Sequence, residues 1–152
     1  MITKTLSILF KRDLLRLREE ISSYQTDANI WKVSEAISNS GGNLCLHLVG
    51  NLNTYIGKEL GKTNYLRNRE LEFSLKNVPR TDLIVMIDET TEIVMSVLDS
   101  LTPEEMQLDF PVLVLERVTT TEYMLIHLAS HLNYHLGQIN YHRRLLDTNN
   151  DK

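Results

Sequence analysis

Apolar residues recur every three or four positions over the first part of the chain, which is the spacing of an amphipathic helix. The segment 2–24 carries this stripe at Ile2, Leu6, Leu9, Phe10, Leu14, Leu17, Ile21 and Tyr24. The turn sequence Asn39-Ser40-Gly41-Gly42 contains a candidate N-cap and precedes a second apolar segment, from about Asn43 to Leu60. The pattern therefore predicts two long helices in this part of the chain.

A third helix is predicted from an inward stripe of Leu83, Ile84, Ile87, Val94, Val97 and Leu98. The pair Thr81-Asp82 can cap its N-terminus, and the helix ends near Ser100. The polar connection before it, from Gly61 to Arg80, has weak periodicity and is expected to be long and partly ordered. After the helix, the sequence Thr102-Pro103-Glu104-Glu105 has the form of a capping box and predicts a short extra turn.

The last part of the chain predicts an extended connection followed by a fourth helix. The β-branched segment from Phe110 to Val118 could form a strand, but a lone strand has no partner, so we expect it to pack on the helices. Thr119 and Glu122 have capping-box spacing and open a helix from Thr120 to about Asp147. Four long helices without an internal repeat predict an all-α fold, an antiparallel four-helix bundle with long crossover connections. The 152 residues have the usual size of one domain, so a single domain over 1–152 is expected.

Net charge and hydropathy argue against two classes of partner. The chain has 16 Lys and Arg against 20 Asp and Glu, and its net charge of -4 would repel a phosphate backbone, so no nucleic-acid partner is expected. No stretch approaches the roughly 18 consecutive apolar residues of a membrane span, and the N-terminus has no signal-peptide core. The single cysteine, Cys45, excludes an intramolecular disulfide and is consistent with a reducing compartment. We therefore expect a cytoplasmic protein.

Four of the five histidines lie on the fourth predicted helix, at His127, His131, His135 and His142. Residues four apart lie one turn above each other, so His131 and His135 can bind one metal ion together. His127 belongs to the same stripe one turn earlier, where a core or ligand-supporting role is expected. His142 lies about 10 Å along the helix axis from His135 and cannot reach the same ion. It is expected at the surface or in an interface.

The fifth histidine, His47, lies within the apolar run Leu44-Cys45-Leu46-His47-Leu48-Val49 of the second predicted helix. An unpartnered imidazole is costly to bury, which is a physical reason to bring His47 to the pair on the last helix. A hydrogen-bonded core histidine is the alternative. Three neutral imidazoles in a facial arrangement suit zinc, nickel, iron or copper and leave positions open for water or a substrate.

Two polar residues lie near the histidines by helical spacing. Gln138 follows His135 by three positions and Asn51 follows His47 by four, so either could orient a ligand or a substrate. The residues between His131 and His135 include no acid. A zincin-like protease, which needs the HExxH pattern, is therefore not expected.

The sequence around these histidines resembles the DinB superfamily of metal-binding four-helix bundles. The segment His131-Leu132-Asn133-Tyr134-His135-Leu136-Gly137-Gln138 looks like the family's HxxxH-x-GQ signature, and His47 matches its mid-helix histidine. GNLCLHLVGNL, RNRELEF and YHLGQINYHRRLL are similar to an uncharacterised branch. The resemblance implies a ligand set of His47, His131 and His135, zinc or nickel as the ion, an unusual helix crossing order and a homodimer. Leu136 stands where many relatives carry a basic residue, so any contact of that residue with an anionic substrate is in doubt.

Characterised relatives include thiol-dependent S-transferases and isomerases, so the resemblance implies a metal-dependent transferase or hydrolase with a small-molecule substrate and a low-molecular-weight thiol as a candidate cofactor. Arg67, Arg69 and Glu70 lie in the long connection and could contact the substrate. A non-catalytic metal-binding or stress-associated protein is the alternative, with His127 as the fourth ligand of a closed site. A third hypothesis is a metal-free dimerising scaffold whose histidines are hydrogen-bonded.

Overall fold

The computed structural model describes residues 2–148, and this part of the chain is helical with no strand. The predicted domain 1–152 includes Met1 and residues 149–152, which lie outside the described part. Four long helices are present: α1 (Ile2–Ser22), α3 (Gly41–Leu52), which continues as the π-helix η1 (Asn53–Lys58), α5 (Arg80–Ser100) and α7 (Thr121–Leu146). Three short helices connect them: α2 (Asp27–Ile30), α4 (Arg69–Ser74) and α6 (Pro103–Gln107).

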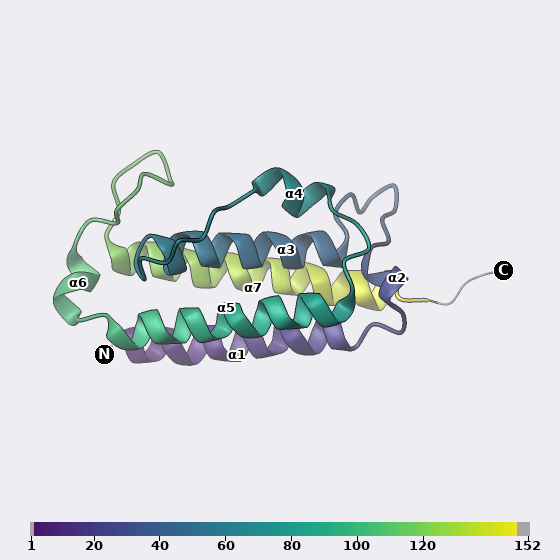
Figure 1. The fold of residues 1–152 in the computed structure, drawn as a ribbon, viewed down its shortest axis with the longest axis horizontal. Coiled ribbons are helices and arrows are strands. Elements are labelled where there is room, and N and C mark those ends of the chain that lie inside the picture. Colours follow the sequence, from purple (N-terminus) through teal and green to yellow (C-terminus); the bar gives the residue numbers. More distant parts are fainter. Residues whose placement is uncertain (1, 149–152) are drawn as a thin grey trace.

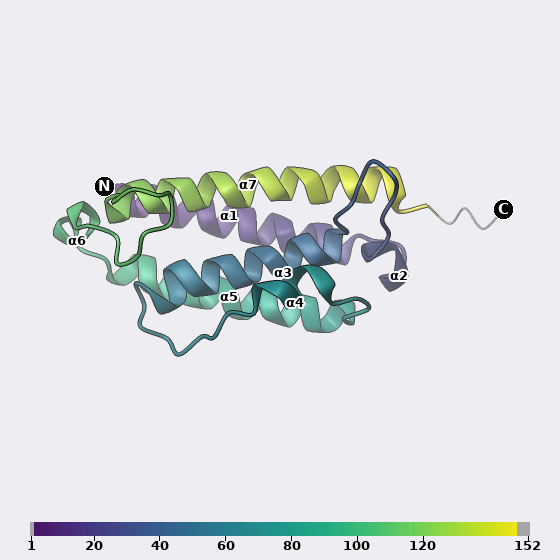
Figure 2. The same cartoon turned by 90° about the horizontal axis from the view of Figure 1, so that it is seen from above.

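The long helices lie side by side, with α1 packed on α5 and α7, and α3 also packed on α5 and α7 (Figures 1 and 2). Helix α1 is antiparallel to α5, because Arg18 pairs with Asp88 whereas the earlier Ser7 bonds the later Asp99. It is parallel to α7, because Asp13 bonds Asn133. Further along both of these helices, Glu20 bonds Asn140 at the same spacing.

The directions of the other two helix pairs also follow from contacts between their residues. Helix α3 is antiparallel to α7, since Gly41 lies beside His142 and the later His47 lies beside the earlier His131. Its continuation η1 runs parallel to α5, to which it is joined by a hydrogen bond from Asn53 Nδ2 to Thr90 Oγ1 of 2.8 Å. Two parallel helices that follow each other in the chain need a connection that returns along their length. The segment between η1 and α5 is this crossover, and it carries α4 across α3 (Figure 1).

The core lies between the long helices. Its central side chains are fully buried, and they come from all four: Phe10, Leu14, Leu17 and Ile21 of α1, Leu48 and Leu52 of α3, Leu83 and Ile87 of α5, and Leu128, Leu132 and Ile139 of α7. These are mostly the residues of the predicted stripes, because an apolar face repeated at the helical period has to be buried against neighbouring helices. The predicted helix positions are confirmed to within a few residues.

The predicted helix starts are confirmed in two places and wrong in two. Ser40 caps α3 by accepting from Asn43 N, and the capping box of Thr102 is present at α6. Helix α5, however, begins at Arg80 without a side-chain cap, so the predicted Thr81-Asp82 cap is wrong. At α7 the N-cap is Thr120, whose side chain accepts from Tyr123 N.

The predicted capping box of Thr119 and Glu122 at α7 is wrong. With Thr120 as the N-cap, the third residue of the helix is Tyr123, which has no carboxylate to complete a box. The extended connection over 110–118 contains neither helix nor strand. An isolated bridge between Asp109 and Thr120 closes it, and Phe110 is its buried anchor.

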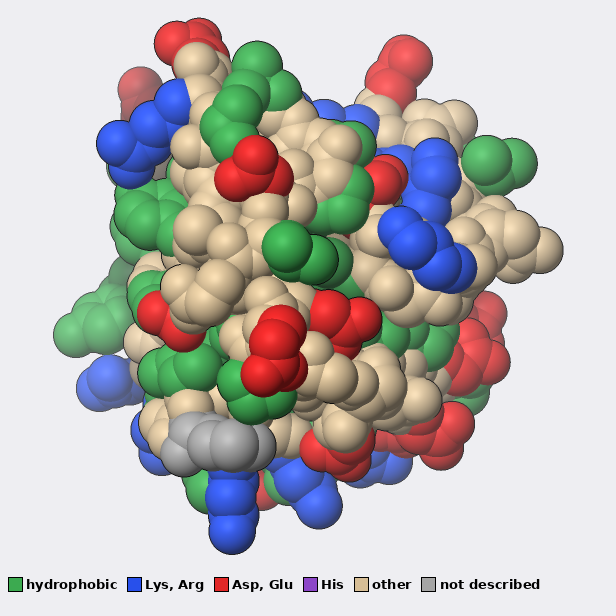
Figure 3. All heavy atoms as spheres, turned by 90° about the vertical axis from the view of Figure 1, so that its left-hand side faces the viewer, with side chains coloured by type: hydrophobic (Ala, Val, Ile, Leu, Met, Phe, Trp, Pro, Cys, Tyr) green, Lys and Arg blue, Asp and Glu red, His purple; other side chains and the backbone are tan. Residues whose placement is uncertain are grey.

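The end of the molecule that carries α6 shows acidic and basic side chains scattered among apolar ones (Figure 3). This face has no large area of one charge. None of the helices in residues 2–148 combines the length and the apolar character that crossing a lipid bilayer requires.

Candidate metal centre

Three histidines meet between α3 and α7. His47 lies in the middle of α3 and is buried, whereas His131 and His135 lie one turn apart on α7 and are partly buried. His131 Nε2 lies 3.2 Å from His47 Nε2 and 3.1 Å from His135 Nε2. The structure thus places the three predicted ligand residues together, with one nitrogen of each ring facing a common point.

Two of the three rings have their tautomer fixed by a neighbouring oxygen. His47 Nδ1 lies 3.0 Å from Glu72 Oε1, and His135 Nδ1 lies 2.6 Å from Gln138 Oε1. Both oxygens are acceptors, so each Nδ1 carries the hydrogen and each Nε2 presents a lone pair. The lone pairs of His47 and His135 therefore point toward His131, which is an arrangement that a cation stabilises.

The spacing of the nitrogens fits a tetrahedral ion. Two nitrogens that each lie about 2.0–2.1 Å from zinc are separated by roughly 3.4 Å, close to the separations on either side of His131. Burial, and then the neighbouring histidines, lower the pKa of His131 to about 4. Burial also lowers the pKa of His135. Both rings are thus neutral at pH 7, as a metal ligand must be.

Glu72 is the functional residue that the sequence analysis missed. It is buried on α4, where Arg67 holds its carboxylate through Nε to Oε2 at 2.8 Å and Nη2 to Oε1 at 2.9 Å. Burial raises the pKa of Glu72, but hydrogen bonds from His47 and Arg67 outweigh this and keep it below its ordinary value. Glu72 is therefore an ionised carboxylate next to His47.

Only a weak signal in the sequence could have indicated Glu72. Asn68 caps α4 by accepting from Leu71 N, and the first turn is acidic, which is a helix-start pattern. That pattern predicts a short helix in the long connection. The helix-start pattern does not tell which acidic residue is buried. Glu72 is buried and Glu70 exposed because of the way α4 lies on α3.

Helix α4 covers one side of the centre. The ring of Phe73 lies 5.1 Å from the His47 ring, centroid to centroid. Asn43 Nδ2 of α3 donates to the carbonyls of Glu72 and Leu75 at 3.0 and 2.8 Å. These bonds hold the backbone of α4 against α3, so the crossover forms part of the centre's wall.

The remaining predicted residues lie in other environments. His127 is outside the group of side chains close enough to share one ion, and its ring centroid lies 6.3 Å from that of His131. Arg69 and Glu70 are exposed, and neither side chain has a hydrogen bond or ion pair among residues 2–148. Of the three charged residues expected to meet a substrate, only Arg67 reaches the centre. Leu136 is buried.

The prediction for His142 is wrong, because it is buried rather than at the surface. Its Nδ1 lies 2.7 Å from Tyr24 Oη and its Nε2 lies 2.8 Å from the Lys32 carbonyl. Burial lowers the pKa of His142. The helical spacing correctly separated His142 from the other histidines, but it carried no information about Tyr24 and Lys32, which come from other segments.

Two buried polar atoms at or near the centre have no hydrogen-bond partner among the described residues. They are His131 Nδ1 and Asn51 Oδ1. Asn51 lies one helical turn after His47 on the same face of α3. Buried polar groups are rarely left unpaired, so these atoms remain available to a water molecule or to a polar group of a ligand.

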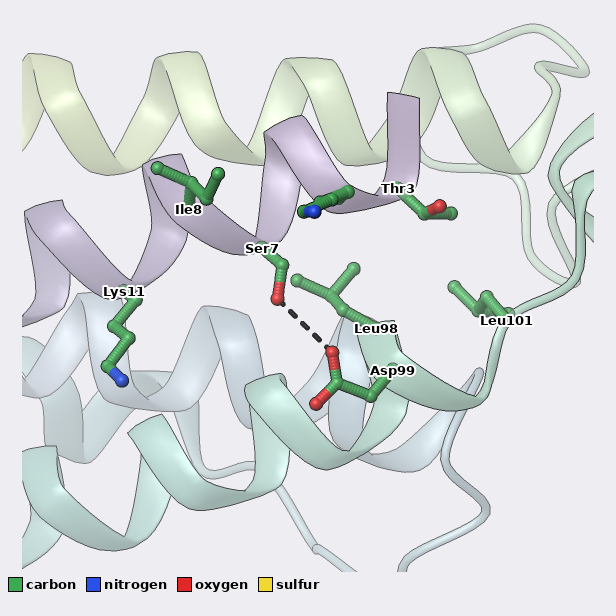
Figure 4. Close-up of a pocket in the computed structure, with 8 residues that line it drawn as sticks. Thr3, Ser7, Ile8, Lys11, Leu98, Asp99 and Leu101 are labelled. Atoms are coloured by element: carbon green, nitrogen blue, oxygen red, sulfur yellow. Dashed lines mark hydrogen bonds between the residues drawn. The ribbon is translucent and has the colours of Figure 1, made fainter. Parts of the chain in front are cut away.

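A hollow lies away from the histidines. It is a groove of about 400 Å³ between α1 and α5, where Ser7 Oγ bonds Asp99 Oδ1 at 3.4 Å (Figure 4). Its basic side chains, Lys4 and Lys11, are exposed. The groove contains no histidine and no convergent polar cluster, so the histidine centre is the better candidate site.

Comparison with known proteins adds one finding. A family model described as "Protein of unknown function (DUF1572)" matches residues 9–152. Comparisons with curated proteins and with solved structures gave no match. The matched segment includes α3, α4 and α7 and therefore every residue of the histidine centre. The chain belongs to the DUF1572 family, a DinB-like family, and this confirms the resemblance that its histidine motifs indicated.

Proposed function

We propose that the protein is a divalent-metal-dependent enzyme whose ion, zinc or nickel, is held by His47, His131 and His135. One observation carries this proposal. His131 Nε2 lies within hydrogen-bonding distance of the Nε2 atoms of both His47 and His135. Outside acceptors hold those two rings in the tautomer that presents an Nε2 lone pair. Imidazole lone pairs that converge in this way form an arrangement that a divalent cation stabilises.

Three protein ligands leave a tetrahedral ion with an open position, as in catalytic rather than structural zinc sites. His127 lies outside the group, so the structure offers no fourth histidine to close the site. The unpaired Asn51 Oδ1 on the same face of α3 supplies an acceptor for a bound molecule. These features favour a metal-dependent enzyme over the non-catalytic metal-binding alternative.

The charge of the centre favours an anionic ligand at the open position. A histidine that binds a metal ion is neutral, and Arg67 pairs with Glu72, so these side chains add no net charge to that of a divalent ion. Bound there, the ion supplies Lewis-acid chemistry that lowers the pKa of a thiol or a water molecule. A low-molecular-weight thiol, used for S-transfer to an electrophilic small molecule, is the substrate class that we infer. Hydrolysis is the alternative reaction.

The first test is metal content. Protein purified without a histidine tag and dialysed against zinc or nickel should retain about one ion per chain, as expected for a single three-histidine site. Elemental analysis after removal of free metal measures this ratio. If the protein retains no ion under these conditions, the proposal is wrong and the metal-free scaffold is favoured.

The second test is turnover. A panel of low-molecular-weight thiols is combined with generic electrophiles, and thiol consumption is followed with the metal-loaded protein and with protein stripped by a chelator. Activity that requires both the ion and a thiol supports S-transfer. Metal-dependent consumption of an ester without a thiol indicates hydrolysis, and no activity in a metal-loaded sample favours the non-catalytic protein.

We also propose that the four long helices form one DinB-like bundle domain over residues 1–152. The closed ring of contacts among α1, α5, α3 and α7 supports this, as does the family match over 9–152. Two of the neighbouring pairs are antiparallel and two are parallel, which agrees with the unusual crossing order that the family resemblance implies.

A further inference from the structure

We propose that Glu72, held by Arg67, is the positioning residue of the metal centre: it fixes the tautomer and the orientation of His47 from the crossover between η1 and α5. This inference rests on the proposed metal site and assigns a role to a residue outside the ligand set. It is carried by four observations on Glu72, which concern its contact with His47, its burial, its partner Arg67 and the space it occupies beside Gly50.

The contact with His47 is of the kind that tunes a metal ligand. Glu72 Oε1 accepts from His47 Nδ1 at 3.0 Å, on the side of the ring opposite the Nε2 that faces the other histidines. A carboxylate that accepts from the outer nitrogen of a ligating histidine holds the ring and makes the inner nitrogen a better electron donor. Glu72 is the only carboxylate among the described residues that contacts any of the three histidines.

Burial shows that the carboxylate is held in place. The Glu72 side chain is 6% exposed and that of His47 is 8% exposed. An isolated buried carboxylate is very costly, but here Arg67 forms two hydrogen bonds to it and His47 forms a third. The bidentate contact restricts the rotation of the carboxylate, so its Oε1 stays directed at His47.

Gly50 provides the space for this carboxylate. A Cβ atom at residue 50 would overlap Glu72 Oε2 and lie 2.7 Å from Glu72 Cδ. Glycine inside a helix costs about 0.5–1 kcal/mol relative to alanine, yet α3 has glycine at this buried position. By contrast, a Cβ atom at Gly137 of α7 would meet nothing within 4 Å. The absent side chain at Gly50 therefore matches the carboxylate that lies against it.

A competing interpretation is that Glu72 only anchors the crossover to α3. Asn43 already holds that backbone by donating to the carbonyls of Glu72 and Leu75. The two interpretations differ in what a Glu72 variant loses. An anchor affects the stability of the metal-free protein, whereas a positioning residue affects metal affinity at unchanged fold.

The first experiment therefore compares Glu72→Ala, Glu72→Gln and Glu70→Gln in the full chain. Zinc affinity is measured by competition with a chromophoric chelator, and the thermal unfolding of the metal-free form is followed by circular dichroism. We expect zinc affinity to fall about 10–100-fold in Glu72→Ala, the usual loss for a partner of a metal ligand. Glu72→Gln keeps an acceptor oxygen without the charge and should lose less. Glu70→Gln, on the same helix but exposed, should match the wild type.

The second experiment moves the carboxylate without changing it. Gly50→Ala should displace Glu72 and weaken zinc binding in the same direction as Glu72→Ala, whereas Gly137→Ala adds the same methyl group to the helix that carries two ligands and should leave affinity unchanged. In zinc-loaded wild type, nitrogen-detected NMR should show a slowly exchanging hydrogen on His47 Nδ1. That signal should be lost in Glu72→Ala.

The outcomes separate this inference from the function on which it rests. Wild-type protein that binds neither zinc nor nickel overturns both. Wild-type protein that binds zinc, with Glu72→Ala equal to it in affinity, overturns the positioning role alone and leaves the metal site in place. A Glu72→Ala variant that unfolds more easily when metal-free but keeps wild-type affinity identifies Glu72 as an anchor. If Glu72→Ala does not fold, Glu72→Gln and Gly50→Ala decide by the same measurement.

Discussion

His131 and His142 lie on the same helix, and burial lowers the pKa of both, but their surroundings differ. The Tyr24 hydroxyl donates to His142 Nδ1, and His142 Nε2 donates to the Lys32 carbonyl. Both nitrogens of His142 are thus satisfied by the protein. His131 Nε2 instead faces two other imidazole nitrogens, and His131 Nδ1 has no partner among the described residues.

The histidine tautomers also differ between the two environments. His142 carries its hydrogen on Nε2, because a carbonyl can only accept, whereas His47 and His135 carry theirs on Nδ1 for the same reason. A buried histidine with two protein partners stabilises the fold, whereas a group with lone pairs left over can bind a cation. The position of a histidine on a helix does not tell these roles apart, whereas its partners do.

Removing His131 should have the largest effect. We expect His131→Ala to weaken zinc binding by more than the 10–100-fold typical of a supporting residue, because a ligand itself is lost. Competition with a chromophoric chelator measures the affinity. Unchanged affinity in this variant would mean that the ligand assignment is wrong.

Removing His142 should give the opposite pattern. His142→Ala leaves the buried Tyr24 hydroxyl and the Lys32 carbonyl without their partner and opens a cavity, so we expect a loss of about 2–4 kcal/mol in the free energy of unfolding. Urea unfolding of the metal-free protein measures this loss. Zinc affinity, measured on the folded variant, should equal that of the wild type. A large drop in affinity would contradict a purely structural role for His142.

The pH dependence of the metal-free protein should show a smaller effect. The His131 pKa is about 4 in the folded chain, below its ordinary 6.5, so protonation favours the unfolded state. The stabilisation is therefore complete above pH 6.5 and is lost as the pH falls from 6.5 toward 4. We expect the melting temperature of wild type to fall more over this window than that of His131→Gln. If the melting temperatures of the two proteins fall equally with pH, the lowered pKa of His131 is contradicted.

The smallest effect concerns Gly137, which lies on α7 between His131 and His142. Its added Cβ would meet nothing within 4 Å, and alanine is the better helix former. We expect Gly137→Ala to raise the free energy of unfolding by about 0.5–1 kcal/mol, measured by urea unfolding. A destabilised variant would show that something approaches Gly137 in solution.

The sequence predicts the features that depend on helical period and leaves out those that depend on the crossover. Apolar patterns together with turn and cap signals placed four long helices, and the four-residue spacing placed His131 beside His135. Bringing His47 to them also needed a physical argument about burying an imidazole. Glu72 could not be predicted, because its role arises where α4 lies on α3. His142 was placed wrongly since its partners, Tyr24 and Lys32, come from segments with no periodic relation to it.

The order of the helices along the chain also determines when the centre can exist. His47 precedes Glu72 by 25 residues and His131 by 84. During synthesis from the N-terminus, α3 and the crossover leave the ribosome well before α7, which carries two of the three nitrogens. A nascent or truncated chain that lacks α7 presents one histidine and its carboxylate, so it lacks two of the three ligands of the proposed metal site. In the proposed metal site, binding of the ion would therefore have to wait for the synthesis of α7.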